Sequence, residues 1–185
     1  MSFDAIVLAG GAGRRLGGTD KPMLDVAGTP MLTHVVDAVS AARRRVVVGP
    51  RRPIDRTVTW CQEMPPGAGP VAALAAGLPL TRADVLVVLA ADLPGIAPAV
   101  APLLKAVGGS VDVAMLATAA RLNYLAAAWR RPALSEALAR VGDPAGVSMR
   151  ALVAGATVAE VADPGWGDDC DTWTDLDRHR SRSAR

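Results

Sequence analysis

The residues with the clearest chemical potential form a glycine-rich segment near the N-terminus. Residues 8–21 have the sequence LAGGAGRRLGGTDK, which contains five glycines, two arginines and one lysine. Glycines let backbone N–H groups approach phosphate oxygens, and cationic side chains then neutralise the phosphate charge. The segment follows the apolar run 5–8, which is typical of a buried strand. We therefore predict a phosphate-binding loop at the end of a core strand, rather than a merely flexible surface loop.

Two familiar phosphate motifs do not fit this loop. A Walker loop requires Gly-Lys-Ser/Thr at the start of a helix, but Lys21 lies between Asp20 and Pro22. A dinucleotide fingerprint that begins at Gly11 requires a glycine at position 16, where the chain has Leu16. The loop therefore indicates phosphate binding of another kind.

An arginine pair keeps a dinucleotide hypothesis open. Arg51 and Arg52 follow the second predicted strand, where cationic side chains could hold the 2′-phosphate of NADP. An NADP-dependent reductase is therefore an alternative from another enzyme class. It predicts that NADPH binds without a divalent cation.

Acidic residues at another predicted strand end could hold a metal ion. Asp92 follows the apolar run 85–90 and precedes Leu93-Pro94, and proline stops ladder pairing. In open α/β sheets ligands bind beyond the carboxyl ends of the strands. A carboxylate that faces a phosphate loop there provides the hard oxygen ligand that Mg²⁺ requires. Nearer the C-terminus, Asp171 or Thr172 suits the N-cap of the helix predicted from residue 173.

The elements that must position these residues alternate between strand and helix. We predict strands at 5–8, 46–48, 58–60, 85–90, 111–116, 124–129 and 157–161. We predict helices at 30–42, 71–80, 99–107, 132–141, 148–153 and 173–179. Repeated βαβ units predict an α/β fold of three layers with a mainly parallel sheet. A single domain over 1–177 and a flexible basic tail over 178–185 are expected.

Composition excludes several classes of protein. Hydrophobic residues make up 51% of the 185 residues, which excludes a disordered chain, and no unbroken apolar run is long enough to span a membrane. The net charge of +2 is too small to imply a nucleic-acid partner. Two cysteines without metal spacing and an N-terminus without a signal-peptide pattern lead us to expect a cytoplasmic protein.

The glycine-rich segment also carries a family signature. It matches Leu-Ala-Gly-Gly-x-Gly-x-Arg-x-Gly followed by Lys, and the chain resembles the molybdenum cofactor guanylyltransferase family of nucleotidyltransferases. The resemblance implies a Rossmann-like nucleotidyltransferase fold in which the loop wraps a triphosphate. It implies catalytic roles for Arg15, Lys21 and Asp92. The residues that it implies for nucleotide binding are Leu8, Ala9, Gly10, Gly11, Ala12, Gly13, Lys21, Gly69, Pro70 and Asp92.

The same resemblance implies a metal site and an acceptor site. Asp92 and Asp171 would hold Mg²⁺, with Asp169 as a further candidate ligand. Asn123 and Tyr124 on a predicted strand, and Arg150 on the helix that follows, would bind the acceptor. Judged by residue type alone, Tyr124 and Trp129 are more typical of the buried core of a strand than of an acceptor site.

The activity that the resemblance implies is Mg²⁺-dependent transfer of GMP from GTP to molybdopterin, which forms the guanine dinucleotide cofactor and pyrophosphate. A phosphate monoester is already ionised near neutral pH, so the protein needs to position reactants and stabilise charge rather than supply a general base. CTP or another phosphorylated acceptor is an alternative within the family, and a non-catalytic nucleotide- or pterin-binding protein is an alternative outside it. The expected partners are proteins that supply molybdopterin and the molybdoenzymes that receive the cofactor.

Overall fold

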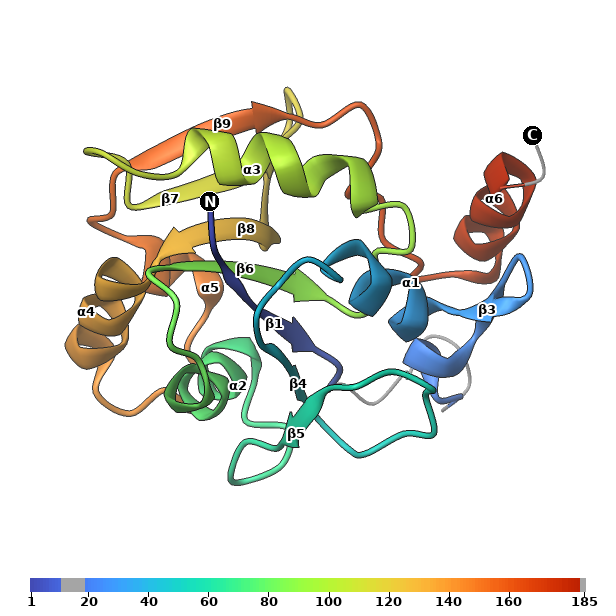
Figure 1. The fold of residues 1–185 in the computed structure, drawn as a ribbon, viewed down its shortest axis with the longest axis horizontal. Coiled ribbons are helices and arrows are strands. Elements are labelled where there is room, and N and C mark those ends of the chain that lie inside the picture. Colours follow the sequence, from blue (N-terminus) through green and yellow to red (C-terminus); the bar gives the residue numbers. More distant parts are fainter. Residues whose placement is uncertain (11–18, 184–185) are drawn as a thin grey trace.

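A seven-stranded sheet organises the chain in the computed structural model, which describes residues 1–10 and 19–183 (Figure 1). Across the sheet the strands lie in the order β5-β4-β1-β6-β8-β7-β9. Their bounds are β1 Asp4–Leu8, β4 Arg45–Val48, β5 Thr59–Cys61, β6 Val85–Ala90, β7 Val113–Ala117, β8 Leu122–Arg130 and β9 Val158–Ala162. The two-residue strands β2 (Asp25–Val26) and β3 (Thr29–Pro30) form a separate hairpin.

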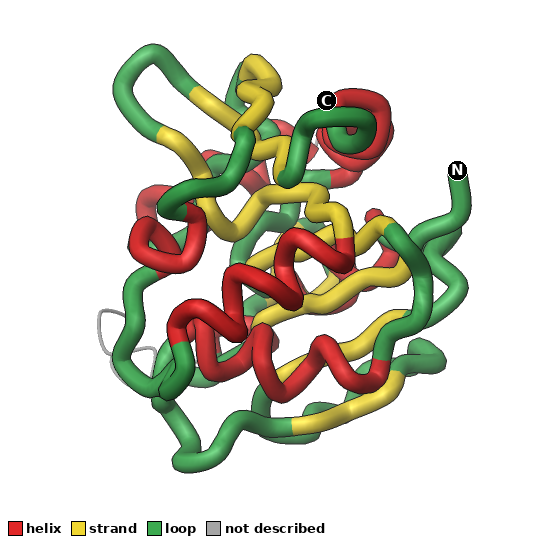
Figure 2. Tube along the Cα trace, turned by 90° about the vertical axis from the view of Figure 1, so that its left-hand side faces the viewer, coloured by secondary structure: helices red, strands yellow, loops and turns green. Residues whose placement is uncertain are grey.

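Helices cover both faces of the sheet, so the expected three-layer α/β fold is confirmed (Figures 1 and 2). The α-helices are α1 Met31–Ala38, α2 Pro70–Gly77, α3 Val100–Ala106, α4 Arg131–Val141, α5 Met149–Val153 and α6 Trp173–Ser183. The 3-10 helices are η2 Lys21–Met23, η3 Leu78–Leu80 and η4 Ala97–Ala99. Helices α1 and α3 pack on one face, and α2, α4 and α5 pack on the other.

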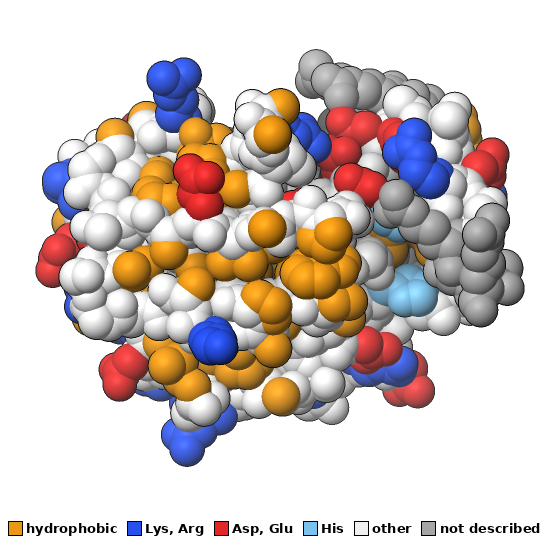
Figure 3. Space-filling model, turned by 90° about the horizontal axis from the view of Figure 1, so that it is seen from above, with side chains coloured by type: hydrophobic (Ala, Val, Ile, Leu, Met, Phe, Trp, Pro, Cys, Tyr) orange, Lys and Arg blue, Asp and Glu red, His pale blue; other side chains and the backbone are white. Residues whose placement is uncertain are grey.

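The central strands are apolar on both sides because both faces of the sheet are covered. In β1, Ala5 and Val7 point into the core beneath α1 and α3, whereas Ile6 and Leu8 point into the core beneath α2, α4 and α5. Burial of this kind explains why short apolar runs marked β1 and β6 in the sequence. On the face seen in Figure 3, charged side chains of both signs are scattered around apolar surface.

The sheet is mainly parallel, as predicted, but β8 runs antiparallel to both of its neighbours. Strand β9 is again parallel to β7. The chain reaches β8 from β7 through a short turn, in which Thr118 donates its backbone N–H to the carbonyl of Arg121. A turn this short cannot provide the crossover that a parallel pair requires.

The C-terminal segment differs from the expected flexible tail over 178–185. Helix α6 continues to Ser183, beyond the predicted end at residue 179, and it lies beside the β2–β3 hairpin (Figure 1). Leu176 is buried against Val26 and Met31, and the Arg180 guanidinium donates to the backbone oxygen of Asp25 at 3.1 and 3.2 Å. These contacts hold a segment whose composition alone predicts solvation.

The N-terminus of α1 also differs from the prediction. The predicted helix over 30–42 begins at Pro30, but Thr29 and Pro30 form β3 and pair with Asp25 and Val26 of β2. The helix starts at Met31 and ends at Ala38, four residues before the predicted end.

Among the described residues, no helix combines the length and apolar character needed to cross a membrane.

Candidate functional site

A cavity of about 920 Å³ opens where β1 and β6 end side by side, with Leu8 opposite Ala90 in the sheet register. This is the edge of an open α/β sheet at which ligands bind. The described residues that line it include most of the predicted site. They are Leu8, Gly10, Lys21, Pro22, Glu63, Gly67, Gly69, Pro70, Ala73, Ala90, Ala91, Asp92, Leu93, Arg121, Leu122, Asn123, Tyr124, Leu125, Gly146, Val147, Ser148, Met149, Asp169 and Asp171.

Lys21 connects the two predicted metal ligands. It begins the 3-10 helix η2, and its Nζ donates to Asp92 Oδ2 at 2.5 Å and to Asp171 Oδ1 at 2.6 Å. Asp92 follows β6, and Asp171 lies just before α6, so the contacts join segments 71 and 150 residues from Lys21 in sequence. The Cys170 backbone N–H donates to the Asp92 carbonyl at 3.2 Å, which ties these two segments together directly.

The charges around Lys21 alter the protonation equilibria of the cluster. Burial lowers the pKa of Lys21, but attraction to Asp92 and hydrogen bonds to Asp171 and Asp92 outweigh it, and the net pKa is above the ordinary value. Burial raises the pKa of Asp169, and repulsion from Asp171 and Asp92 raises it further. The cavity therefore concentrates negative charge, and one ammonium group already balances part of it.

The paired carboxylates fit a hard divalent cation. Asp92 and Asp171 each place an oxygen within hydrogen-bonding distance of one cationic atom, so they can face a single ion. No group of three or more His, Cys, Asp or Glu side chains gathers for a metal within residues 1–10 and 19–183. Two carboxylates suit Mg²⁺, which commonly takes its remaining ligands from water and substrate phosphates.

The backbone at the start of the glycine-rich loop is approached closely by Gly49, which follows β4. A Cβ atom built on Gly49 would lie 2.8 Å from the carbonyl carbon and oxygen of Ala9 and 2.9 Å from the nitrogen of Gly10. Gly49 also has a φ of +143°, which side chains disfavour. Glycine at this position therefore lets Ala9 and Gly10 lie against β4. The predicted binding residue Gly10 lines the cavity.

The predicted nucleotide turn at Gly69 and Pro70 forms another part of the wall. Pro70 is the first residue of α2, where its fixed φ favours helix initiation and its missing N–H leaves no unpaired donor. Gly69 precedes the helix with a φ of +102°. Both residues line the cavity, as their predicted role requires.

Glu63 is a site residue that the sequence analysis missed. It is buried, and its Oε1 accepts the Gly67 backbone N–H at 2.9 Å. Its Oε2 is buried without a hydrogen-bond partner in the described part of the chain. Glu63 also lies close to Gly10, since a Cβ built on that glycine would be 3.6 Å from Oε1. The sequence contains one weak signal, a single glutamate within the apolar and glycine-rich turn before Gly69.

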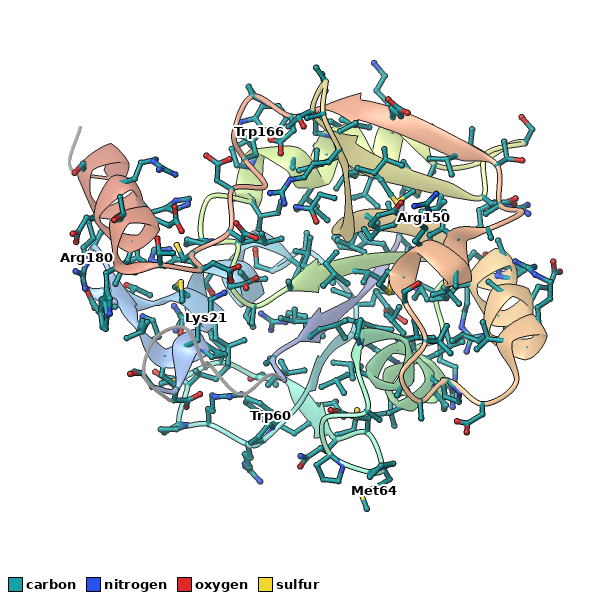
Figure 4. The ribbon with its side chains drawn as sticks, turned by 180° about the vertical axis from the view of Figure 1, so that it is seen from behind. Lys21, Trp60, Met64, Arg150, Trp166 and Arg180 are labelled. Carbon is teal, nitrogen blue, oxygen red and sulfur yellow. The ribbon has the colours of Figure 1, made fainter. Side chains whose placement is uncertain are left out.

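The predicted acceptor residues are not all in the cavity wall. Tyr124 lines the cavity and is half-buried. Asn123 also lines it, but its Nδ2 donates to the Gly167 carbonyl at 3.1 Å and its Oδ1 accepts the Leu125 N–H at 3.1 Å. Arg150 is exposed on α5 and is not among the lining residues, so its predicted place in the site is not supported (Figure 4).

Arg121 provides a cation on this side of the cavity instead. It lies just before β8, is exposed and lines the cavity, and its charge opposes the raised pKa of Asp169. Lys21 and Arg121 are the two cations among the described lining residues, against four carboxylates. Lys21 lies on the side of η2 and α6, away from Arg150 (Figure 4).

Several predicted residues cannot be placed. Arg15, Gly11, Ala12 and Gly13 lie outside the described residues. The arginines considered for NADP are both described: Arg51 is exposed, whereas Arg52 is buried and absent from the described cavity lining. Because the guanidinium of Arg52 bonds to Asp20 and to backbone carbonyls, it does not form an open phosphate site with its neighbour.

A mainly parallel sheet with a charged cavity at its strand ends defines a protein of the Rossmann-like α/β class. More narrowly, the chain belongs to the family of the MobA-like NTP transferase domain, whose model matches residues 5–161. A relative from Shewanella putrefaciens, named molybdenum cofactor guanylyltransferase, is 31% identical over 99 residues, which are 51% of each chain. A relative from Synechococcus elongatus, named probable molybdenum cofactor guanylyltransferase, is 37% identical over 111 residues, which are 56% of each chain. The chain thus spans about half the length of the curated relatives it matches.

Solved structures share the whole fold at low sequence identity. The 2-C-methyl-D-erythritol 4-phosphate cytidylyltransferase from Thermus thermophilus superposes with a TM-score of 0.78 at 20% identity and full coverage of both chains. The molybdopterin-guanine dinucleotide biosynthesis protein A from Archaeoglobus fulgidus gives 0.72 at 19% identity, covering 98% of each chain. These likenesses establish the architecture.

Proposed function

We propose that this protein transfers GMP from GTP to molybdopterin in a Mg²⁺-dependent reaction, forming the guanine dinucleotide cofactor and pyrophosphate. Family membership and the names of the relatives support this proposal. The observation that carries it is the position of Lys21 between Asp92 and Asp171. The cluster lies in a cavity that Gly69 and Arg121 also line, and we assign the nucleotide to the side of Gly69 and the acceptor to the side of Arg121.

Each member of the cluster has a proposed task. Asp92 and Asp171 would hold Mg²⁺, which would supply positive charge to offset the charge of the α-phosphate and the pyrophosphate. Lys21 contacts the phosphates of GTP, with Arg15 as a further cation from the glycine-rich loop. The acceptor phosphate is already ionised, so alignment and charge neutralisation supply the rate enhancement without a general base.

Glu63 supports the choice of guanine. Guanine carries two adjacent donors, at N1 and at the 2-amino group, whereas cytosine and adenine lack that pair. The Glu63 carboxylate lies beside Gly10 and is suited to accept hydrogen bonds from both donors. Its Oε2 is buried and has no hydrogen-bond partner among the described residues. Glu63→Gln preserves the volume but replaces an acceptor with a donor. We expect GTP affinity to fall about 10- to 100-fold, with smaller changes for CTP.

Use of CTP remains the competing function because a cytidylyltransferase shares the fold. Equal binding of GTP and CTP to the wild type, with no effect of Glu63→Gln on either, would indicate that another residue recognises the base.

On the acceptor side, we assign to Arg121 the binding of the phosphate of molybdopterin, because Arg121 lines the cavity. Proteins that supply molybdopterin and receive the product are the proposed partners, and the free thiols Cys61 and Cys170 suit the cytoplasm.

Calorimetric titration tests the proposal directly. GTP, CTP, ATP and NADPH are titrated into the protein with and without Mg²⁺, and into Asp92→Ala. We expect tight GTP binding that requires Mg²⁺ and is lost in Asp92→Ala, together with molybdopterin-dependent release of pyrophosphate by the wild type. Metal-independent binding of NADPH, or metal-dependent GTP binding that survives in Asp92→Ala, would contradict the corresponding assignment.

A further inference from the structure

The side chain of Asn123 joins β8 to the chain segment that carries two of the acidic residues. Its Nδ2 donates to the Gly167 carbonyl at 3.1 Å, and its Oδ1 accepts the Leu125 backbone N–H at 3.1 Å. Gly167 is buried and precedes Asp169 by two residues. One amide therefore connects two segments that both contribute to the cavity wall, through Leu125 and Asp169.

An irregularity in the sheet places this amide between the two segments. In the pairing of β7 with β8, Met115 is opposite Ala127, but the next residue, Leu116, is opposite Asn123, so residues 124–126 are skipped. Such bulges redirect side chains and are common next to active sites. The hydrogen bond from the Leu125 N–H to the Asn123 Oδ1 lies within this bulge.

The segment that follows β9 is held at Gly167 from two sides (Figure 4 labels the adjacent Trp166). On one side is Asp163, whose Oδ1 accepts the backbone N–H groups of Gly165, Trp166 and Gly167 at 2.9, 2.7 and 3.2 Å. On the other side is Asn123. A Cβ atom built on Gly167 would lie 2.8 Å from Asp163 Oδ2 and 3.0 Å from Asn123 Nδ2. Gly167 therefore fits closely between these two side chains.

Further contacts join the same segment to the proposed metal site. The Cys170 backbone N–H donates to the Asp92 carbonyl at 3.2 Å, and Asp171 Oδ1 accepts a hydrogen bond from the Lys21 ammonium at 2.6 Å. Only three residues separate Gly167 from Asp171. A displaced Gly167 would therefore shift Asp171 relative to Asp92.

We propose that Asn123 is a positioning residue for the acidic segment 168–171: it holds the Gly167 carbonyl and thereby keeps Asp171 close to Asp92, rather than binding the acceptor. Carboxylates held in place lose less conformational entropy when they bind a cation. Hydrogen bonds that orient the ligands of a metal ion raise its affinity without touching the ion. This inference rests on the proposed function, since it assumes that Asp92 and Asp171 hold a divalent cation.

Titration of the nucleotide-free protein with Mn²⁺, detected by electron paramagnetic resonance, tests this role without any acceptor. Asn123→Leu is similar in size and lacks both hydrogen bonds, so we expect the Kd for Mn²⁺ to rise about 3- to 10-fold. Thr118→Val is the matched control, because Thr118 Oγ1 accepts the Arg121 backbone N–H at 3.2 Å in the turn before β8, outside the described cavity lining. It should leave the Kd unchanged. If Asp92→Asn weakens Mn²⁺ binding but folded Asn123→Leu does not, or if Thr118→Val weakens it equally, the proposal is overturned.

A second variant separates position from charge and also serves if Asn123→Leu does not fold. Asn123→Asp keeps the volume and the acceptor for the Leu125 N–H, but it replaces the donor that faces the Gly167 carbonyl with an acceptor oxygen. An added carboxylate in the cavity wall would by itself attract Mn²⁺ and lower the Kd. The positioning role predicts the opposite sign, a higher Kd at pH 8. A lower Kd in Asn123→Asp would overturn it.

Hydrogen exchange without metal or nucleotide separates failure of this inference from failure of the proposed function. In Asn123→Leu we expect the Cys170 backbone N–H, which donates to the Asp92 carbonyl, to exchange about 3- to 10-fold faster than in the wild type. Thr118→Val should exchange at the wild-type rate. Equal exchange in all three proteins would refute the role of Asn123 even if Mn²⁺ binds at Asp92. Faster exchange in Asn123→Leu, together with Mn²⁺ binding that Asp92→Asn does not affect, would retain the positioning role and refute the metal assignment.

Discussion

Replacing Lys21 with methionine tests how the ammonium group and a divalent cation share the acidic cluster. The side chains of Lys21, Asp92 and Asp171 are 14%, 26% and 38% exposed. In the metal-free protein, a cation that enters between the two carboxylates must displace the ammonium from both. Methionine has a similar length but no charge, so the variant removes this competition.

The size of the effect follows from the two contacts. A hydrogen bond to a charged group contributes roughly 1.5–3 kcal/mol, and the partial exposure of both carboxylates favours the lower value. Two such contacts amount to about 3 kcal/mol, which corresponds to roughly 100-fold in affinity. Return of the displaced ammonium to water offsets part of this, so we expect metal binding to tighten by about 10- to 100-fold in Lys21→Met.

The assay is titration of nucleotide-free protein with Mn²⁺, detected by electron paramagnetic resonance. Mn²⁺ has the same preference for oxygen ligands as Mg²⁺. Lys105→Met is the control, because Lys105 is the other lysine of the chain and is exposed on α3. GTP binding in the presence of saturating metal should change in the opposite direction in Lys21→Met, since the variant lacks a phosphate contact.

An unchanged or weaker Mn²⁺ affinity in Lys21→Met would refute competition between the two cations. Asp92→Asn identifies where the metal binds. If the wild type and Lys21→Met bind Mn²⁺ and Asp92→Asn binds it equally well, the ion occupies another position and the metal assignment is wrong.

Three further predictions concern groups around the fold. Burial raises the pKa of Cys170 to about 12, so a thiol reagent at pH 8 should modify the half-buried Cys61 first; equal rates by mass spectrometry would contradict this. The Thr157 backbone N–H donates to the Asp112 carboxylate and holds the pKa of Asp112 below its ordinary value. The ionised Asp112 therefore stabilises the folded protein above the pKa that Asp112 has in the unfolded chain, and this stabilisation is lost as the pH falls through its pKa in the folded protein. Asp112→Asn should therefore cost about 1 kcal/mol at pH 7, and denaturant melts below about pH 4 should show the difference shrinking rather than persisting. Gly49→Ala should destabilise the protein by about 2 kcal/mol and weaken GTP binding, whereas a wild-type melting temperature would disprove the close approach.

The elements that sequence patterns predicted well are those whose burial is complete. The apolar run of β6 has the predicted bounds, and β1 begins one residue earlier than predicted, because strands covered on both faces contain few polar residues. The composition of β8 does not indicate its direction, since a buried strand has the same composition whichever way it runs; the short connection from β7 does, because a parallel pair requires a longer crossover. The β2–β3 hairpin was missed because Thr29 and Pro30 also suit the start of a helix.

The position of Asp92 in the cavity was predictable, because a carboxylate directly after a buried strand lies at the sheet edge where ligands bind. The partnership of Lys21 with Asp171 was not, because 150 residues separate them and the contact depends on how α6 packs. The position of Arg52 after a predicted strand suggested an arginine available to bind phosphate. In the folded protein its guanidinium instead donates to Asp20, a contact that the sequence does not indicate. Glu63 has only a weak signal in the sequence, a lone acidic residue in an apolar and glycine-rich turn, and its burial near Gly10 becomes evident in the structure.

The contacts that hold the C-terminal part of the site differ from those that hold the sheet together. Val26, Met31, Cys170 and Leu176 form a small apolar cluster of their own. This cluster holds α6 against the β2–β3 hairpin, whereas the seven strands pack through two other cores. The matched family region also ends at residue 161, before Asp169 and Asp171. Damage to this cluster would therefore disperse the acidic residues while most of the hydrophobic core persists. Yield and solubility would then be poor guides to activity, and a well-expressed variant could be catalytically silent.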